Sequence, residues 1–211
     1  IYLTTSAKSA GADAALLVTP YYNKPTQEGL YLHYQLIADE VDLPQILYNV
    51  PSRTGCDLLN DTVMRLVDHQ NIVGLKDATG DLGRLENFVT NLDSEQKDNF
   101  ALYSGDDPTA TEFMISGGTG TISVTSNIVP KTISNICDYA LSGEAKAARD
   151  LDTTLVRLNQ ILFIESNPIP VKWMLNRIGR ITDGIRLPLS RLDSKFHDKA
   201  EEVLAELNLL N

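Results

Sequence analysis

Near the middle of the chain stands Ile72-Val73-Gly74-Leu75-Lys76, followed at once by Asp77-Ala78-Thr79-Gly80-Asp81. The first four residues are apolar or small, and the segment after the lysine is rich in residues that favour turns. A short apolar run bounded in this way is typical of a strand that is buried on both faces of a parallel sheet. We therefore expect a buried strand that ends at Lys76.

The position of Lys76 suggests a chemical role. Burial against apolar groups disfavours the ammonium form of lysine, so a lysine at the end of a buried strand loses its proton more easily. The neutral amine is the nucleophile that forms a Schiff base with a carbonyl substrate. The alternative is a lysine that closes the strand and extends its ammonium group into solvent. The sequence of this stretch alone does not decide between these two roles of Lys76.

The composition excludes several classes of protein. The chain has 211 residues, of which 43% are hydrophobic and 22% are charged, as in a globular protein. Its net charge of −10 argues against nucleic acid or an anionic membrane as a partner. No apolar run approaches the ~20 residues of a membrane span and no signal peptide is evident, so we expect a cytoplasmic protein. Cys56 and Cys137 indicate neither a disulfide framework nor a zinc site.

Short apolar runs alternate with amphipathic segments along the first part of the chain. We expect further strands over residues 14–18, 45–48, 100–103 and 120–124. Helices are expected over residues 26–40, 61–68, 81–92 and 110–115, and from Pro130 onward. The alternation predicts a parallel sheet. After residue 143 only helices are expected, over residues 148–162, from 168 to about 178, and 194–209. We therefore predict an α/β domain over 1–143 and a helical domain over 144–211.

Two architectures fit the predicted strands. Five parallel strands match a doubly wound sheet, whereas a (β/α)₈ barrel has eight and typically occupies ~250 residues. Tyr22, Tyr48 and Lys76 lie at or just beyond the carboxyl ends of three successive predicted strands. Active sites occur at that edge in both architectures, so the placement of these residues does not separate them.

Six motifs in collinear order resemble those of one family. They are Val18-Thr19-Pro20-Tyr21-Tyr22, the segments 47–55, 74–80, 103–107 and 120–124, and Asn167-Pro168-Ile169-Pro170-Val171-Lys172-Trp173. Together they extend over essentially the whole chain. They resemble the dihydrodipicolinate synthase family, one of the pyruvate-dependent class I aldolases, a superfamily that includes N-acetylneuraminate lyase.

The resemblance implies a (β/α)₈ TIM barrel with a C-terminal helical domain. It also implies condensation of pyruvate with L-aspartate 4-semialdehyde in lysine biosynthesis, without a cofactor or a metal ion, by a homotetramer built from two dimers. By the same resemblance Lys76 forms the Schiff base and Tyr48 transfers protons to and from the bound pyruvate. Tyr22 completes a relay of hydroxyl groups across a subunit interface.

The resemblance assigns four further positions. Arg53 receives the carboxylate of the semialdehyde, for which the planar guanidinium fork is suited. Gly105 and Ile122 line the pyruvate pocket through their backbone. Tyr21 matches a residue of the lysine feedback site in family members that have one.

One segment of the family pattern is absent from this sequence. The glycine-threonine-threonine-glycine-glutamate segment, whose threonines bind the pyruvate carboxylate and bridge the two tyrosines, has no match. Thr4-Thr5 precede Ser6-Ala7 and fall in a predicted helix, so they are not its equivalent. The chain carries only the last five of the eight barrel strands by this comparison, and we expect three βα units to precede residue 1.

Alternatives remain open at this point. Within the same superfamily the chain could be an N-acetylneuraminate lyase-like enzyme or a sugar-acid dehydratase, and outside it a non-catalytic fragment or pseudoenzyme. Tyr22 and Tyr48 could be core or interface aromatics. Lys172 beside Trp173 is a rival nucleophile, or a lysine that pairs or stacks on a surface. We interpret Asp106-Asp107 as the N-terminal cap of a helix.

Overall fold

The computed structural model describes residues 1–210. It divides into two compact units, Ile1–Ile122 and the residues from Ser123 onward. The first unit contains every strand of the sheet, and the second contains helices and loops among its described residues. The predicted domain boundary after residue 143 stays a prediction, because compactness and family topology need not divide a chain at the same residue.

The first unit is built on a parallel sheet, and all five predicted strands are present. The strands are β1 (Ala15–Val18), β2 (Gln45–Asn49), β3 (Ile72–Asp77), β4 (Ala101–Ser104) and β5 (Gly120–Thr121). Strand β5 is shorter than the predicted segment 120–124. Gly74 explains how closely β3 and β4 approach, because a Cβ atom there would stand 2.6 Å from the Ala101 carbonyl oxygen.

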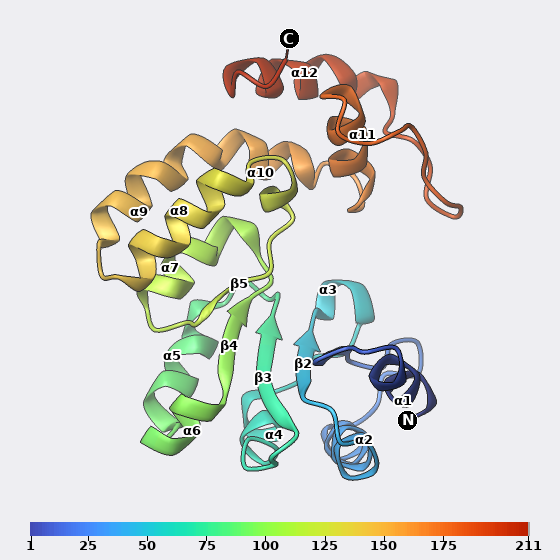
Figure 1. Cartoon of the computed structure of the whole chain (residues 1–211), viewed down its shortest axis with the longest axis vertical. Coiled ribbons are helices and arrows are strands. Elements are labelled where there is room, and N and C mark those ends of the chain that lie inside the picture. The colour runs from blue at the N-terminus through green and yellow to red at the C-terminus, as the bar shows by residue number, and fades with distance from the viewer. Residues whose placement is uncertain (211) are drawn as a thin grey trace. The chain divides into compact units, whose positions relative to one another are not determined.

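The strand order distinguishes the two architectures. The sheet runs β1-β2-β3-β4-β5, with every neighbouring pair parallel. Figure 1 shows β2 to β5 side by side in this order. A doubly wound sheet reverses its order at a switch point, whereas strands of a (β/α)₈ barrel follow one another in chain order. The sequential order therefore favours the barrel.

Helices connect the strands of the first unit. They are α1 (Tyr2–Ser9), α2 (Gln27–Glu40), α3 (Pro51–Thr54), α4 (Asn60–Met64), α5 (Leu82–Asn91), α6 (Ser94–Asn99) and α7 (Ala110–Ile115). The predictions for α2, α5 and α7 are confirmed within one residue at each end. Helix α4 ends earlier than predicted, at Met64. Helix α6 was not predicted, although Asp93 and Gln96 form a capping box at its start.

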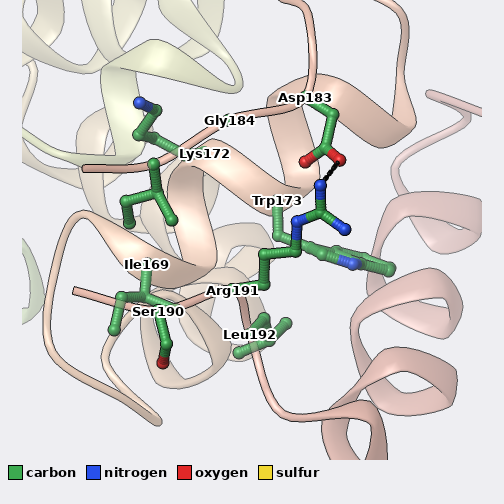
Figure 2. A pocket seen from close by; sticks show the side chains of 9 residues that line it. Ile169, Lys172, Trp173, Asp183, Gly184, Ser190, Arg191 and Leu192 are labelled. Carbon is green, nitrogen blue, oxygen red and sulfur yellow. Dashed lines mark ion pairs between the residues drawn. The ribbon is translucent and has the colours of Figure 1, made fainter. Parts of the chain in front are cut away.

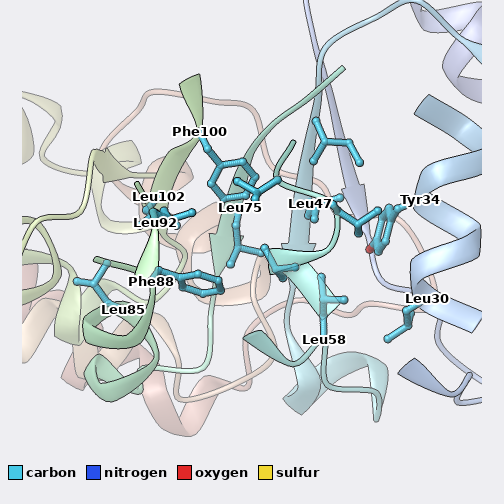
Figure 3. Close-up of a cluster of buried hydrophobic side chains, with 14 of the residues drawn as sticks. Leu30, Tyr34, Leu47, Leu58, Leu75, Leu85, Phe88, Leu92, Phe100 and Leu102 are labelled. Atoms are coloured by element: carbon cyan, nitrogen blue, oxygen red, sulfur yellow. The ribbon is translucent and has the colours of Figure 1, made fainter. Parts of the chain in front are cut away.

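The main hydrophobic core lies between the sheet and helices α2, α4 and α5 (Figure 3). Leu47 of β2 and Leu75 of β3 are at most 1% exposed and belong to this core. Tyr34 of α2 is also fully buried, and its hydroxyl donates to the Leu17 carbonyl oxygen at 3.2 Å. Since successive strand residues point to opposite faces, Tyr48 and Lys76 face away from this core.

The second unit consists of helices among its described residues. They are α8 (Pro130–Leu141), α9 (Ala145–Asp152), α10 (Val156–Leu162), α11 (Ile169–Arg177) and α12 (His197–Glu206), with short 3₁₀ turns over Thr125–Asn127, Thr153–Leu155 and Ser194–Phe196. Pro130 opens α8 at its first turn, as predicted. No helix within residues 1–210 combines the length and the apolar character of a membrane span. The cytoplasmic location stays a prediction.

The prediction of a single helix over residues 148–162 is wrong. A 3₁₀ turn at Thr153–Leu155 separates α9 from α10. The hydroxyl of Thr153 donates to the Asp150 carbonyl oxygen at 2.7 Å, and that of Thr154 donates to the Leu151 carbonyl oxygen at 2.6 Å. Threonine side chains that bond to the preceding turn compete with the helix ladder and bend it. Two of them in succession account for the interruption.

Candidate active site

Strand pairing brings Tyr48 and Lys76 side by side. In the parallel register of β2 and β3, Tyr48 is the direct partner of Lys76. Both stand near the carboxyl ends of their strands and on the same face of the sheet. The Lys76 Nζ atom lies 4.3 Å from the centroid of the Tyr48 ring. The structure therefore unites the two side chains predicted to carry the chemistry.

The surroundings of Lys76 favour its neutral form. Burial lowers the pKa of the Lys76 amine, and the positive charge of Arg53 lowers it further. The negative charge of Asp107 acts in the opposite direction, but it does not reverse the shift. A larger fraction of Lys76 is therefore unprotonated at neutral pH than for a lysine in water. This is the form required of a nucleophile.

Gly105 gives the Lys76 side chain its space. A Cβ atom at Gly105 would stand 2.7 Å from Cε of Lys76 and 2.9 Å from Cβ of Ala78, closer than such atoms approach. The Gly105 N–H donates to the Asp77 carbonyl oxygen at 2.7 Å, which fixes the backbone beside the lysine. A side chain at this position would displace Lys76, so there is a steric reason for a glycine beside this lysine.

Tyr48 is suited to hold a proton rather than to act as a free phenolate. Burial raises the pKa of the Tyr48 phenol, and the positive charge of Arg53 only partly opposes the shift. The phenol therefore stays protonated at neutral pH. A protonated phenol can donate to a developing oxyanion and pass the proton along linked hydroxyl groups.

Arg53 reaches this site because of a short helix that begins directly after β2. Pro51 occupies the first turn of α3, and Gly55 ends the helix with a left-handed φ of 66°. Arg53 lies in the last turn of α3 with an exposed side chain. Its charge acts on both Tyr48 and Lys76. The guanidinium is thus at the same edge of the sheet as the nucleophile, on the side open to solvent.

Ile122 lies at the same edge, beyond the end of β5. Its N–H donates to the Ser104 carbonyl oxygen at 2.9 Å and continues the pairing with β4. The residues predicted at the strand ends are therefore brought together from β2, β3, β4 and β5. They are Tyr48, Arg53, Lys76, Gly105 and Ile122.

The two tyrosines after β1 are not brought to this group. Tyr21 is 66% exposed and Tyr22 is 94% exposed. Within residues 1–210 the Tyr22 ring makes no aromatic contact and its hydroxyl no hydrogen bond. Tyr22 and Lys24 have φ angles of 22° and 44°, which are strained for residues with side chains. The predicted relay role of Tyr22 is not tested within a single chain.

The interpretation of Asp106-Asp107 as a helix cap needs correction. Asp106 occupies the N-cap position of the 3₁₀ turn Asp107–Thr109, but no backbone N–H donates to its side chain as a cap. Its carboxylate instead accepts the Thr109 hydroxyl at 2.7 Å. Asp107 is only 5% exposed, and its charge acts on Lys76. In the sequence, the position of Asp107 shortly after the apolar run that forms β4 could have indicated that its carboxylate acts on Lys76.

Lys172, the rival nucleophile, lies in the helical unit. It borders a cavity of about 20 Å³, enough for about one water molecule. Figure 2 shows the Lys172 side chain pointing away from Trp173. Trp173 stacks on His197 instead, with 4.6 Å between ring centroids. Lys172 lies on α11 in the second unit, whereas Tyr48 and Lys76 are paired on adjacent strands of the first.

Within residues 1–210 no three His, Cys, Asp or Glu side chains gather into a group that could hold a metal ion. The described site itself offers an amine, a phenol, a guanidinium and a buried carboxylate, from Lys76, Tyr48, Arg53 and Asp107. This set is suited to an imine-forming reaction on an anionic carbonyl compound.

A family model described as the dihydrodipicolinate synthetase family matches residues 1–207. The chain belongs to this family. It is 53% identical over 210 residues to 4-hydroxy-tetrahydrodipicolinate synthase of Pseudomonas syringae pv. syringae (strain B728a), covering 100% of this chain and 70% of that protein.

Solved structures of the dihydrodipicolinate synthetase family have the same fold. The dihydrodipicolinate synthase from Acinetobacter baumannii, a chloride-inhibited enzyme solved with pyruvate, has a TM-score of 0.94 and 52% identity over 99% of this chain and 70% of that chain. The enzyme from Thermotoga maritima has a TM-score of 0.94 and 41% identity, over 99% of this chain and 71% of that chain. The predicted family, the barrel fold class and the lyase function are confirmed.

Proposed function

We propose that this chain carries the Schiff-base site of a 4-hydroxy-tetrahydrodipicolinate synthase, with Lys76 as nucleophile and Tyr48 as proton carrier. The observation that carries the proposal is the pairing of Lys76, whose pKa is lowered, with Tyr48 on the adjacent strand end, where the Lys76 Nζ atom lies 4.3 Å from the centroid of the Tyr48 ring. The function of the family, condensation of pyruvate with L-aspartate 4-semialdehyde in lysine biosynthesis, is that of this chain. The matched family and relatives do not support the sugar-acid alternatives.

The first half of the reaction forms an imine. The neutral Lys76 amine attacks the ketone carbon of pyruvate, a C–N bond forms, and the carbonyl oxygen takes a proton from Tyr48. The attacking nitrogen gives up one of its two protons to the same oxygen, which leaves as water, so that an iminium ion and a deprotonated Tyr48 remain. The iminium is positively charged, and the buried charge of Asp107 acts to stabilise positive charge at Lys76.

The second half forms the carbon–carbon bond. The iminium accepts the electron pair released when a methyl proton of pyruvate is removed, and the resulting enamine attacks the aldehyde carbon of the semialdehyde. The proton goes to the deprotonated Tyr48, and the aldehyde oxygen becomes an alcohol when it is protonated in turn. The iminium nitrogen is therefore the electron sink of the reaction.

Arg53 is proposed to hold the carboxylate of aspartate semialdehyde. Its guanidinium lies on the open side of the site, where the second substrate approaches, and presents a planar fork of donors. Replacing Arg53 with alanine should raise the KM for aspartate semialdehyde by about 10- to 150-fold, the equivalent of a charged hydrogen bond worth about 1.5–3 kcal/mol. The KM for pyruvate should change little.

The measurement is steady-state kinetics of the condensation with each substrate varied in turn. Arg65→Ala is the matched control, because Arg65 pairs with Glu28 on the surface of the same unit at 2.8 Å. Condensation by the unaltered protein tests the function itself. Equal increases in both KM values for Arg53→Ala would indicate a structural role for this residue.

The exposed tyrosine loop after β1 supports a further proposal, an active site shared between subunits. Adjacent exposed tyrosines are typical of the centre of an interface, where aromatic residues are enriched. Residues held in strained backbone conformations often serve a function. We propose that Tyr22 reaches the site of a neighbouring chain in a homotetramer of two dimers. The place of Tyr21 in a lysine feedback site stays a prediction.

Mixing two inactive variants tests this sharing in the complete gene product. Tyr22→Phe should lower activity without changing the assembly, because the ring remains. Mixed with Lys76→Ala, it should recover about a quarter of all sites, since half of randomly paired chains form mixed dimers with one intact site each. Native mass spectrometry confirms the exchange of subunits. Exchange without recovered activity would mean that Tyr22 acts within its own chain.

A further inference from the structure

The register that pairs Tyr48 with Lys76 also pairs the residues that follow them. Asn49 is the direct partner of Asp77 in β2 and β3. Because side chains alternate along a strand, Asn49 and Asp77 point to the face opposite Tyr48 and Lys76. Asn49 is fully buried and Asp77 is 8% exposed. Whatever holds these two polar side chains also fixes the ends of the strands that carry the reacting groups.

Asp77 is held by contacts to both carboxylate oxygens. Its Oδ1 atom accepts the Thr79 N–H at 2.7 Å and the Thr79 hydroxyl at 2.6 Å. Its Oδ2 atom accepts Nε of Arg84 at 3.0 Å. The two bonds to Thr79 shape the turn after Lys76, and the bond to Arg84 connects this turn to helix α5.

Asn49 is tied to the same arginine through the loop after α3. Its Nδ2 donates to Oδ1 of Asp57 at 2.8 Å, and its Oδ1 accepts the Leu58 N–H at 2.9 Å. Arg84 donates from Nη1 to Oδ2 of Asp57 at 3.1 Å and from Nη2 to the Leu58 carbonyl oxygen at 2.6 Å. The Arg84 guanidinium thus bonds directly to Asp77 of β3, and it also bonds to Asp57 and Leu58, which hold Asn49 of β2.

We propose that Arg84 is a positioning residue, which sets the distance between Lys76 and Tyr48 from behind the sheet. The inference rests on the proposed function of these two residues. Five residues form what we term the Arg84 network: Arg84, Asp57, Leu58, Asp77 and Asn49. The Arg84 side chain is only 14% exposed, and its Nε, Nη1 and Nη2 groups all donate within the network.

The geometry of the network requires an arginine. Its planar fork directs Nε to β3 and the two Nη groups to the loop bonded to β2. The single ammonium group of lysine keeps the charge but cannot donate along these three directions at once. A misplacement of reacting groups by about 1 Å is enough to lower the rate of a catalysed step by about 100-fold. The network therefore controls the rate of imine formation without contact to substrate.

Arg84→Lys in the complete gene product tests the inference. Single-turnover mixing with saturating pyruvate, quenched by borohydride, gives a rate and a final amplitude of labelling at Lys76. The amplitude counts folded, competent sites, and the rate reports their geometry. We expect the rate and kcat to fall about 10- to 100-fold, with a change of less than about threefold in the KM for pyruvate.

Two further variants keep the test decisive. Arg65→Lys, in the exposed pair with Glu28, should leave the rate unchanged. Asp57→Asn keeps the shape of a side chain that is 39% exposed, and should lower the rate several-fold even if Arg84→Lys fails to fold. A normal labelling rate in folded Arg84→Lys, or in Asp57→Asn when only that variant folds, would overturn the positioning role. Absence of labelling in the unaltered protein would instead refute the proposed function.

Discussion

Replacing Lys76 with methionine should abolish labelling by pyruvate and borohydride, and should lower kcat by at least about 10⁴-fold, the scale on which loss of a covalent nucleophile acts. Methionine fills a similar volume and suits a site whose burial already disfavours the ammonium group. The fold should therefore persist, because the change removes the amine and little else. Peptide mapping of the labelled, unaltered protein should place the pyruvate adduct on Lys76.

Lys172→Met is the control for this result. Lys172 lies on helix α11 and not on the strands that carry Tyr48 and Lys76, so its loss should change neither the labelling nor kcat. A label that persists in Lys76→Met, or that maps to Lys172 in the unaltered protein, would contradict the assignment. Circular dichroism of both variants shows whether a loss of activity reflects a loss of fold.

The lowered pKa of Lys76 also determines how the labelling by pyruvate and borohydride depends on pH. The folded protein favours the neutral amine, because the pKa of Lys76 lies below its ordinary value of 10.5. The neutral fraction rises with pH through the lowered pKa, so the rate of imine formation should rise with pH and reach half of its maximum below pH 10.5. Protonation of Lys76 at lower pH removes the nucleophile.

Residues whose role depends on one strand were predictable. Lys76 and Tyr48 each stand near the end of an apolar run, and parallel strands necessarily bring their carboxyl ends to one edge. The parallel pairing of the strands also follows from the regular alternation of strands and helices, whereas their order does not. For these features the local pattern of apolar residues already contains the needed information.

Arg84 was not predictable in the same way. It lies 27 residues from Asp57 and 7 from Asp77, and no periodicity connects these positions. Asp107 was interpreted as a cap because aspartate is common before helices, whereas its burial is a property of the folded unit. The break between α9 and α10 was missed because apolar spacing does not register competition from threonine hydroxyls.

Replacing Tyr48 with phenylalanine should lower kcat by about 10²–10⁴-fold, the contribution typical of a positioned general acid or base. The ring remains beside Lys76, whose Nζ atom lies 4.3 Å from its centroid, so burial of the amine is preserved. Borohydride should still label Lys76, but more slowly, because proton transfer to the carbonyl oxygen then depends on water. The KM for pyruvate should change far less than kcat.

Tyr103→Phe provides the matched control for Tyr48→Phe. Tyr103 is the register partner of Lys76 on the other side, in β4, so its side chain stands on the same face of the sheet. Loss of its hydroxyl should leave the rate of labelling close to that of the unaltered protein. The raised pKa of Tyr48 predicts that the alkaline fall in activity lies above the ordinary value of 10 and is absent from Tyr48→Phe. Equal losses in the two variants would mean that proton transfer does not pass specifically through Tyr48.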